Sequence, residues 1–101
     1  MKYAERFYLV DISLREEYIR RHQEIWPEMK ALIEKSGIYN YTIWCSGTDL
    51  FACFESDDID RTYDVLMHSL IKKQWDESMK GLIHYGGRVT PEQLELVFYL
   101  R

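Results

Sequence analysis

Tyr18 and His22 are the two residues whose types and spacing are best suited to chemistry. They lie four positions apart, so in a helix they project from one face, one turn apart. An imidazole titrates near neutral pH and can both give and take a proton, while a neighbouring phenol can hold a hydroxyl group or orient the ring. The pair therefore suggests acid–base chemistry. The alternative is plain packing, because a single histidine on an apolar helix face is more often a core residue.

The helix that must position this pair is predicted over residues 13–37. At about 100° per residue its apolar side chains fall on one arc, and His22 lies in the middle of that arc. Charged and amide side chains cover the opposite face, so the imidazole and the phenol are expected to point toward the interior. The apolar arc consists of Tyr18, Ile19, Ile25, Trp26, Met29, Leu32 and Ile33.

The ends of this helix and one internal proline carry their own signals. Ser13 followed by Glu16 is typical of a capping box at a helix N-terminus, and Gly37 suits the C-terminal stop. Pro27 lacks an N–H group, which predicts a kink or an interruption near Gln23. Such a break would open space beside the histidine.

Aromatic and β-branched runs predict four strands, over residues 5–11, 39–45, 50–55 and 93–100. Turn residues at 46–49 join the second and third strands into an antiparallel hairpin. Within the second strand, alternation places Tyr39, Tyr41 and Ile43 on one face. We expect this face to be turned toward the helix.

A second helical region is predicted to begin at residues 56–58. Its apolar face rotates near His68 and Ser69, which indicates a break followed by a second helical piece that carries Trp75. Neither His68, at this break, nor His84, in a predicted loop, belongs to a convergent group of polar residues. Both are therefore expected at the surface.

The order strand, helix, strand, strand, helix, strand predicts an α+β protein with a ferredoxin-like fold, in which helices cover one face of a four-stranded antiparallel sheet. At 101 residues the chain is expected to form one domain over residues 1–101. The predicted strands carry apolar side chains in both orientations, so the open sheet face is expected to meet a partner. A homodimer with sheet packed on sheet, of the dimeric α/β-barrel type, is the simplest solution. A C-terminal segment folded over this face is the alternative.

Composition excludes several classes of function. The formal net charge is −4 with both signs interspersed, which argues against a nucleic-acid surface. No apolar run has the length of a membrane span and the first ten residues show no signal-peptide pattern, so we expect a cytoplasmic protein without a membrane partner. The two cysteines, Cys45 and Cys53, have no Cys-X-X-Cys or Cys/His spacing. Free thiols and no metal site are expected.

Several stretches together resemble the L-rhamnose mutarotase family, whose members interconvert the anomers of a deoxyhexose. They are EEYIRRH at 16–22, IWPE at 25–28, NY at 40–41, LFA at 50–52, KQWDESM at 73–79 and VFYL at 97–100. The similarity covers nearly the whole chain and lies in the order of the stretches rather than in any one of them. It implies a dimeric ferredoxin-like fold and catalysis without a metal or organic cofactor.

The resemblance also implies roles for single residues. It makes His22 the proton donor and brings Tyr18, Tyr41 and Trp75 to the sugar. In the family a second tryptophan follows the first, whereas this chain has Asp76 at that place. A carboxylate offers no stacking face but accepts hydrogen bonds from hydroxyl groups. The departure leaves the choice of sugar open among L-rhamnose, L-fucose and other aldoses.

Three functions therefore compete at this stage. The first is a cofactor-free aldose 1-epimerase in which His22 acts as general acid and base. The second is a small ferredoxin-like monooxygenase or haem-handling protein, since this scaffold serves several chemistries. The third is a non-catalytic sugar-binding or regulatory module whose aromatic pocket holds a ligand without turnover.

Overall fold

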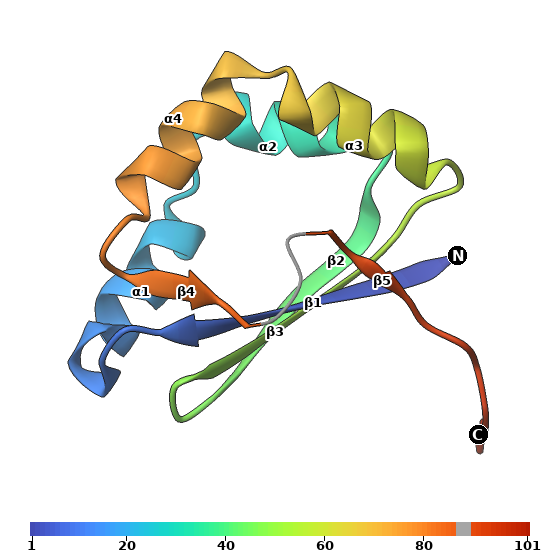
Figure 1. The fold of residues 1–101 in the computed structure, drawn as a ribbon, viewed down its shortest axis with the longest axis horizontal. Helices are drawn as coiled ribbons and strands as arrows, with labels where there is room; N and C mark the ends of the chain where they lie inside the picture. Colours follow the sequence, from blue (N-terminus) through green and yellow to red (C-terminus); the bar gives the residue numbers. More distant parts are fainter. Residues whose placement is uncertain (87–89) are drawn as a thin grey trace.

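An antiparallel sheet with helices arched over one of its faces makes up the body of the protein (Figure 1). The structure is a computed structural model and describes residues 1–86 and 90–101. Strands run in the order β2-β3-β1-β4, and a short β5 pairs with the first half of β1. Their bounds are β1 (Lys2–Leu9), β2 (Tyr39–Ser46), β3 (Asp49–Glu55), β4 (Ile83–Tyr85) and β5 (Glu92–Gln93). All pairs are antiparallel.

The strand predicted over residues 93–100 is wrong. The strand beside the second half of β1 is β4, whose three residues include His84, and only Glu92 and Gln93 pair with β1 further along. The last backbone contact of this kind joins the Leu94 N–H to the Lys2 carbonyl. Beyond it the chain runs away from the sheet (Figure 1). Its apolar residues at 96–100 are between 74% and 88% exposed, because they pair with none of the strands that the structure describes.

The first helical region is divided as Pro27 predicted. A short 3-10 helix η1 (Ile12–Leu14) leads into α1 (Arg15–Gln23), and α2 (Pro27–Lys35) begins with the proline at its first turn. The predicted capping box at Ser13 is wrong, since Asp11 accepts the Ser13 N–H and thereby caps η1 instead. Gly37 follows α2 with a φ of +90°, a backbone conformation that suits glycine.

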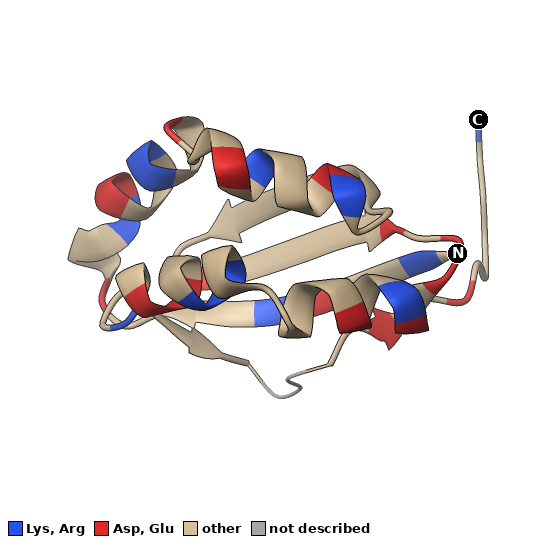
Figure 2. Ribbon diagram, turned by 90° about the horizontal axis from the view of Figure 1, so that it is seen from above, with Lys and Arg blue, Asp and Glu red and all other residues tan. Residues whose placement is uncertain are grey.

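The second helical region is divided at the predicted break. Its two pieces are α3 (Ile59–Met67) and α4 (Leu70–Ser78). Asp58 caps α3 by accepting the Arg61 N–H, and Ser69 caps α4 by accepting the Lys72 N–H. None of the helices in residues 1–86 and 90–101 is long and apolar enough to cross a membrane. Lys and Arg alternate with Asp and Glu along these helices, so no basic stripe forms there (Figure 2).

Alternation along β1 and β3 separates the two sheet faces. The buried Leu50, Ala52 and Phe54 of β3 face the helices and belong to the core between the sheet and the helices. The main core cluster contains Leu9, Tyr18, Met29, Leu50, Trp75, Met79 and Leu82.

A β-bulge interrupts the alternation on β2. Tyr39 is opposite Glu55 and Thr42 is opposite Cys53. Between these pairs, Asn40 and Tyr41 of β2 are opposite the single residue Phe54 of β3. Asn40 has a φ of +50° there. The prediction that Tyr39 shares a face with Tyr41 is therefore wrong: Tyr41 faces the helices, whereas Tyr39 is paired with a residue of the open face.

The open face of the sheet keeps apolar side chains in solvent. Trp44 is 66% exposed, and Tyr8 is also exposed. Cys45 and Cys53 are both free thiols, and they belong to opposite faces of the hairpin, which separates their sulfur atoms.

Candidate functional site

A cavity of about 850 Å³ lies between the inner face of the sheet and the helices. It is large enough for a monosaccharide, and its wall is mostly apolar with a limited set of polar side chains. Each of the five residues predicted for the site lines it. The polar and aromatic lining consists of Glu5, Phe7, Tyr18, His22, Tyr41, Phe54, Thr62, Tyr63, Lys72, Lys73, Trp75, Asp76, Glu77, Lys80 and Tyr85.

His22 lies in the last turn of α1 and is half-buried. Its Nδ1 atom is 3.0 Å from the carbonyl oxygen of Tyr18. Burial lowers the pKa of His22 below its ordinary value, and the hydrogen bond to this carbonyl partly opposes the shift. Within the described part of the chain no hydrogen bond is made to Nε2. The neutral ring therefore keeps one nitrogen with a free lone pair beside the cavity.

Aromatic rings fix the orientation of this imidazole. The Tyr18 ring centroid is 4.3 Å from that of His22, and the Trp75 ring meets His22 edge-on at 5.4 Å and 86°. Trp75 also makes an edge-on contact with Trp26 at 5.3 Å. Because Trp75 is buried among these partners, it forms one wall of the cavity and part of the core at once.

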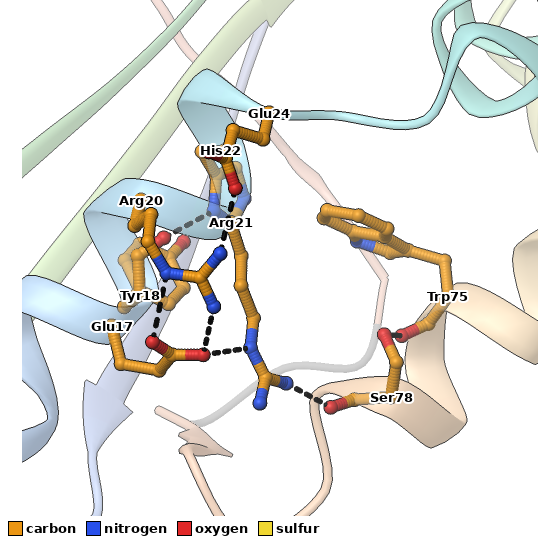
Figure 3. Close-up of polar contacts among 8 residues, drawn as sticks. All are labelled: Glu17, Tyr18, Arg20, Arg21, His22, Glu24, Trp75 and Ser78. Atoms are coloured by element: carbon orange, nitrogen blue, oxygen red, sulfur yellow. Dashed lines mark hydrogen bonds and ion pairs between the residues drawn. The ribbon is translucent and has the colours of Figure 1, made fainter.

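Polar contacts hold α1 against α4 beside His22 and Trp75 (Figure 3). Arg21 donates a hydrogen bond to the carbonyl oxygen of Ser78, and its Nε lies 2.8 Å from a carboxylate oxygen of Glu17. Hydrogen bonds from Arg20 and Arg21 lower the pKa of Glu17 to about 2, so this carboxylate stays ionised. The Arg21 contact keeps the helix of His22 beside the helix of Trp75.

Tyr41 reaches the cavity from the bulge in β2. Its ring stacks on Phe54 at 5.8 Å and 12°, and 40% of the residue is exposed. Burial raises the pKa of its hydroxyl group, and the nearby Glu5 carboxylate raises it further. The phenol therefore stays protonated and can donate a hydrogen bond.

Asp76 enters the cavity from α4, one turn after Lys72. The Lys72 ammonium contacts both carboxylate oxygens of Asp76, at 2.5 and 2.6 Å. The acidic side chain at this place is thus ion-paired.

Sequence reasoning missed Glu5, Lys72 and Tyr85 as lining residues. Glu5 carries a signal that would have revealed it, since it interrupts an otherwise apolar inward row of β1 formed with Tyr3, Phe7 and Leu9. A carboxylate in such a row rarely serves packing alone. Lys72 and Tyr85 lack a comparable pattern.

The remaining histidines lie at the surface, as predicted. His68 follows α3, where its Nδ1 is 2.8 Å from the Asp64 carbonyl oxygen. His84 is exposed, although it belongs to β4 and not to a loop. No group of three or more His, Cys, Asp or Glu residues that would hold a metal ion occurs among residues 1–86 and 90–101.

Comparison with known proteins identifies the family. The family model described as L-rhamnose mutarotase matches residues 2–100, nearly the whole chain. The chain belongs to the L-rhamnose mutarotase family. It is accordingly an isomerase of the mutarotase type, which agrees with the epimerase activity considered first from the sequence.

Curated members of the family cover most of the chain. L-rhamnose mutarotase from Tolumonas auensis is 38% identical over 88 residues, which are 83% of this chain and 84% of that protein. L-rhamnose mutarotase from Paraburkholderia phytofirmans is 35% identical over 92 residues, which are 87% of this chain and 85% of the relative.

Solved structures confirm the predicted ferredoxin-like fold class. The crystal structure of L-rhamnose mutarotase from Formosa agariphila matches with a TM-score of 0.73 and 26% identity, over 100% of this chain and 99% of that one. A dimeric ferredoxin-like protein from an uncultured marine organism matches with a TM-score of 0.64 and 15% identity, over 98% of both chains. The second match supports the fold alone.

Proposed function

We propose that this family member interconverts the α and β anomers of a deoxyhexose, with L-rhamnose as its first candidate substrate and His22 as its general acid and base. The observation that carries the proposal is the position of His22: it is half-buried, is anchored through Nδ1 to the Tyr18 carbonyl, and lines an 850 Å³ cavity. The remaining nitrogen, Nε2, is the group that would reach the sugar.

The proposed reaction moves one proton between two oxygens bound to the same carbon. Neutral His22 accepts the proton of the anomeric hydroxyl at Nε2 while the bond between C1 and the ring oxygen breaks. The imidazolium then gives this proton to the ring oxygen, which leaves an open-chain aldehyde. After rotation about the C1–C2 bond, the reverse steps close the ring on the other face of C1. General acid–base help of this kind contributes about 10²–10⁴-fold.

The neighbouring side chains suit a sugar. Tyr18 supports the imidazole, and the hydroxyl group of Tyr41 is available as a hydrogen-bond donor inside the cavity. The Trp75 ring supplies an apolar surface for the C–H face of the sugar, and Asp76 offers carboxylate oxygens to sugar hydroxyls. The Lys72–Asp76 pair would make this part of the site more polar than a second aromatic ring would.

We also propose that the protein acts as a homodimer. A single chain leaves two apolar surfaces in water: the open sheet face around Trp44 and the C-terminal segment 96–100. In a two-fold dimer each copy contributes the same surfaces to the interface, so a second copy would cover the open sheet face and the C-terminal segment together.

The activity is tested by saturation-transfer NMR on L-rhamnose, L-fucose and several other aldoses. Faster exchange between anomer signals in the presence of catalytic amounts of protein is the expected result for at least one deoxyhexose. Sugar binding without faster exchange would instead identify a binding module and would contradict the proposed reaction.

A further inference from the structure

Glu5 occupies an unusual place in the sheet. It lies on β1, the central strand, opposite the fully buried Ala52 of β3, and in the row that faces the helices. Its neighbours in that row are Tyr3 and Phe7, which pack against other rings. A carboxylate at such a position loses part of its hydration, which raises its pKa, and this cost needs compensation from a partner.

The described part of the chain does not supply this partner. No hydrogen bond or ion pair to the Glu5 carboxylate is found among residues 1–86 and 90–101. Two charges act on it from α4: Lys72 favours its ionised form and Asp76 opposes it. Lys72, however, is held by both oxygens of Asp76. The residues that the structure describes therefore leave the oxygens of Glu5 available to a molecule in the cavity.

Glu5 and His22 serve different parts of this cavity. On α4, Trp75 and Asp76 are successive residues, whose directions differ by about 100°. Trp75 contacts the ring of His22, whereas Asp76 acts on Glu5. Tyr41, whose hydroxyl group is protonated, lines the same cavity as Glu5 and His22.

The shape of a sugar matches this separation. In a pyranose ring, C1 and the ring oxygen form one edge, and C3 and C4 form the opposite edge. If His22 acts at the first edge, the second edge is directed away from it, toward the group of Glu5, Lys72 and Asp76. Two vicinal hydroxyls can donate to the two oxygens of one carboxylate, which gives strong, charge-assisted hydrogen bonds.

We propose that Glu5 is a substrate-binding residue that accepts hydrogen bonds from the hydroxyl groups on C3 and C4 of the sugar, and that the site selects aldopyranoses in which both hydroxyls are free. This proposal depends on the proposed function, because that function places C1 at His22. It gives Glu5 a role in holding the sugar and none in the proton transfer.

The test compares Glu5→Gln and Glu5→Ala with the parent, using L-rhamnose and its 3-deoxy and 4-deoxy analogues. Glu28→Gln, an exposed change on α2, is the matched control. We expect KM for L-rhamnose to rise roughly 10- to 100-fold in Glu5→Ala, as is typical for a lost hydrogen bond to a charged group, with little change in kcat. The control should keep the KM of the parent.

The deoxy analogues separate direct binding from a structural effect. If Glu5 binds these hydroxyls, the analogues should bind the parent more weakly than L-rhamnose, and Glu5→Ala should no longer distinguish them from L-rhamnose. An unchanged KM in Glu5→Ala, a fall in kcat alone, or equal discrimination in parent and variant would overturn the proposal. Circular dichroism identifies a variant that fails to fold, in which case the same comparison is made with Glu5→Gln, which keeps the side-chain shape.

Calorimetric titration of the same sugars into His22→Ala distinguishes this proposal from the reaction itself. Weaker binding after a further Glu5→Gln change would support the role of Glu5 even if no anomer exchange is catalysed. Equal binding with and without that change would contradict it even if the parent is an active mutarotase.

Discussion

The Nδ1 atom of His22 lies 3.0 Å from the carbonyl oxygen of Tyr18, one turn earlier in α1. A carbonyl oxygen can only accept a hydrogen bond, so Nδ1 must carry the proton. In the neutral ring this leaves Nε2 as the basic nitrogen. The backbone of α1 therefore selects the tautomer that the proposed reaction requires.

The rate of anomer exchange should depend on pH through this ring. Because burial lowers the pKa of His22 below 6.5, the neutral, active form predominates at pH 7. We expect kcat/KM to be level from neutral to mildly alkaline pH and to fall on acidification, with a midpoint below 6.5, because kcat/KM reports the ionisation of the free enzyme. Measuring kcat/KM by NMR over this range tests the direction, and a kcat/KM that rises on acidification would contradict it.

Arg21→Ala should loosen α1 from α4. The variant loses the hydrogen bond to the Ser78 carbonyl, so we expect the free energy of unfolding to fall by about 1 kcal/mol and anomer exchange to slow as the contact between His22 and Trp75 becomes less defined. Arg20→Ala is the control, since Arg20 pairs with acidic residues of its own helical segment. Urea unfolding gives the stability; equal losses in both variants would be evidence against this role of Arg21.

Thr62→Val should destabilise the fold while keeping the shape of the side chain. The Thr62 hydroxyl donates to the Ser36 carbonyl at 2.6 Å and shares a hydrogen bond with the Ser56 hydroxyl at 2.8 Å, and all three residues are buried. Removing the hydroxyl takes the donor from the Ser36 carbonyl and the acceptor from the Ser56 O–H, while Ser56 Oγ keeps only the Asp58 N–H, at a cost of about 1–3 kcal/mol. Thr48→Val, at an exposed position, should change the urea midpoint little. A Thr62→Val midpoint equal to that of the parent would show that the network contributes nothing.

Phe98→Asp should convert a dimer into monomers if residues 96–100 lie at the interface. A buried charge without a partner is unfavourable in an apolar interface. Met67→Asp is the control, because Met67 is 61% exposed on the helical side of the molecule. Sedimentation equilibrium should give a dimer for the parent and the control. A monomeric parent would refute the proposed assembly, and a dimeric Phe98→Asp variant would exclude this segment from its interface.

Local signals in the sequence predicted most of the helical architecture. Pro27 marked the interruption between α1 and α2, and the rotation of the apolar face near Ser69 marked the one between α3 and α4. The prediction of a cap at Ser13 was wrong because Asp11 and Ser13 are both suited to cap the start of this helical region. Asp11 is the residue that does so, and it caps a short 3-10 helix before α1. Which of two neighbouring capping residues is used depends on the path of the chain leaving β1, which a local pattern does not contain.

Non-local pairing explains the errors in the strands. The apolar segment 96–100 reads as a strand, but β1 has no free edge for it because β4 and β5 already pair there. With three residues, β4 is too short to give a pattern. In the site, helical spacing predicted that the side chains of Tyr18 and His22 point toward the interior. The bulge that separates Tyr41 from Tyr39, and the convergence of Glu5 with Asp76, depend on contacts between distant segments.

The rate of anomer exchange in His22 variants tests the central claim most directly. Saturation-transfer NMR would compare the parent with His22→Ala and His22→Asn, and with His68→Ala and His84→Ala as surface controls. The proposed mechanism predicts that both His22 variants remain folded and lose at least about 100-fold in rate, while the two controls match the parent. A folded His22→Ala variant that exchanges the anomers as fast as the parent would contradict it.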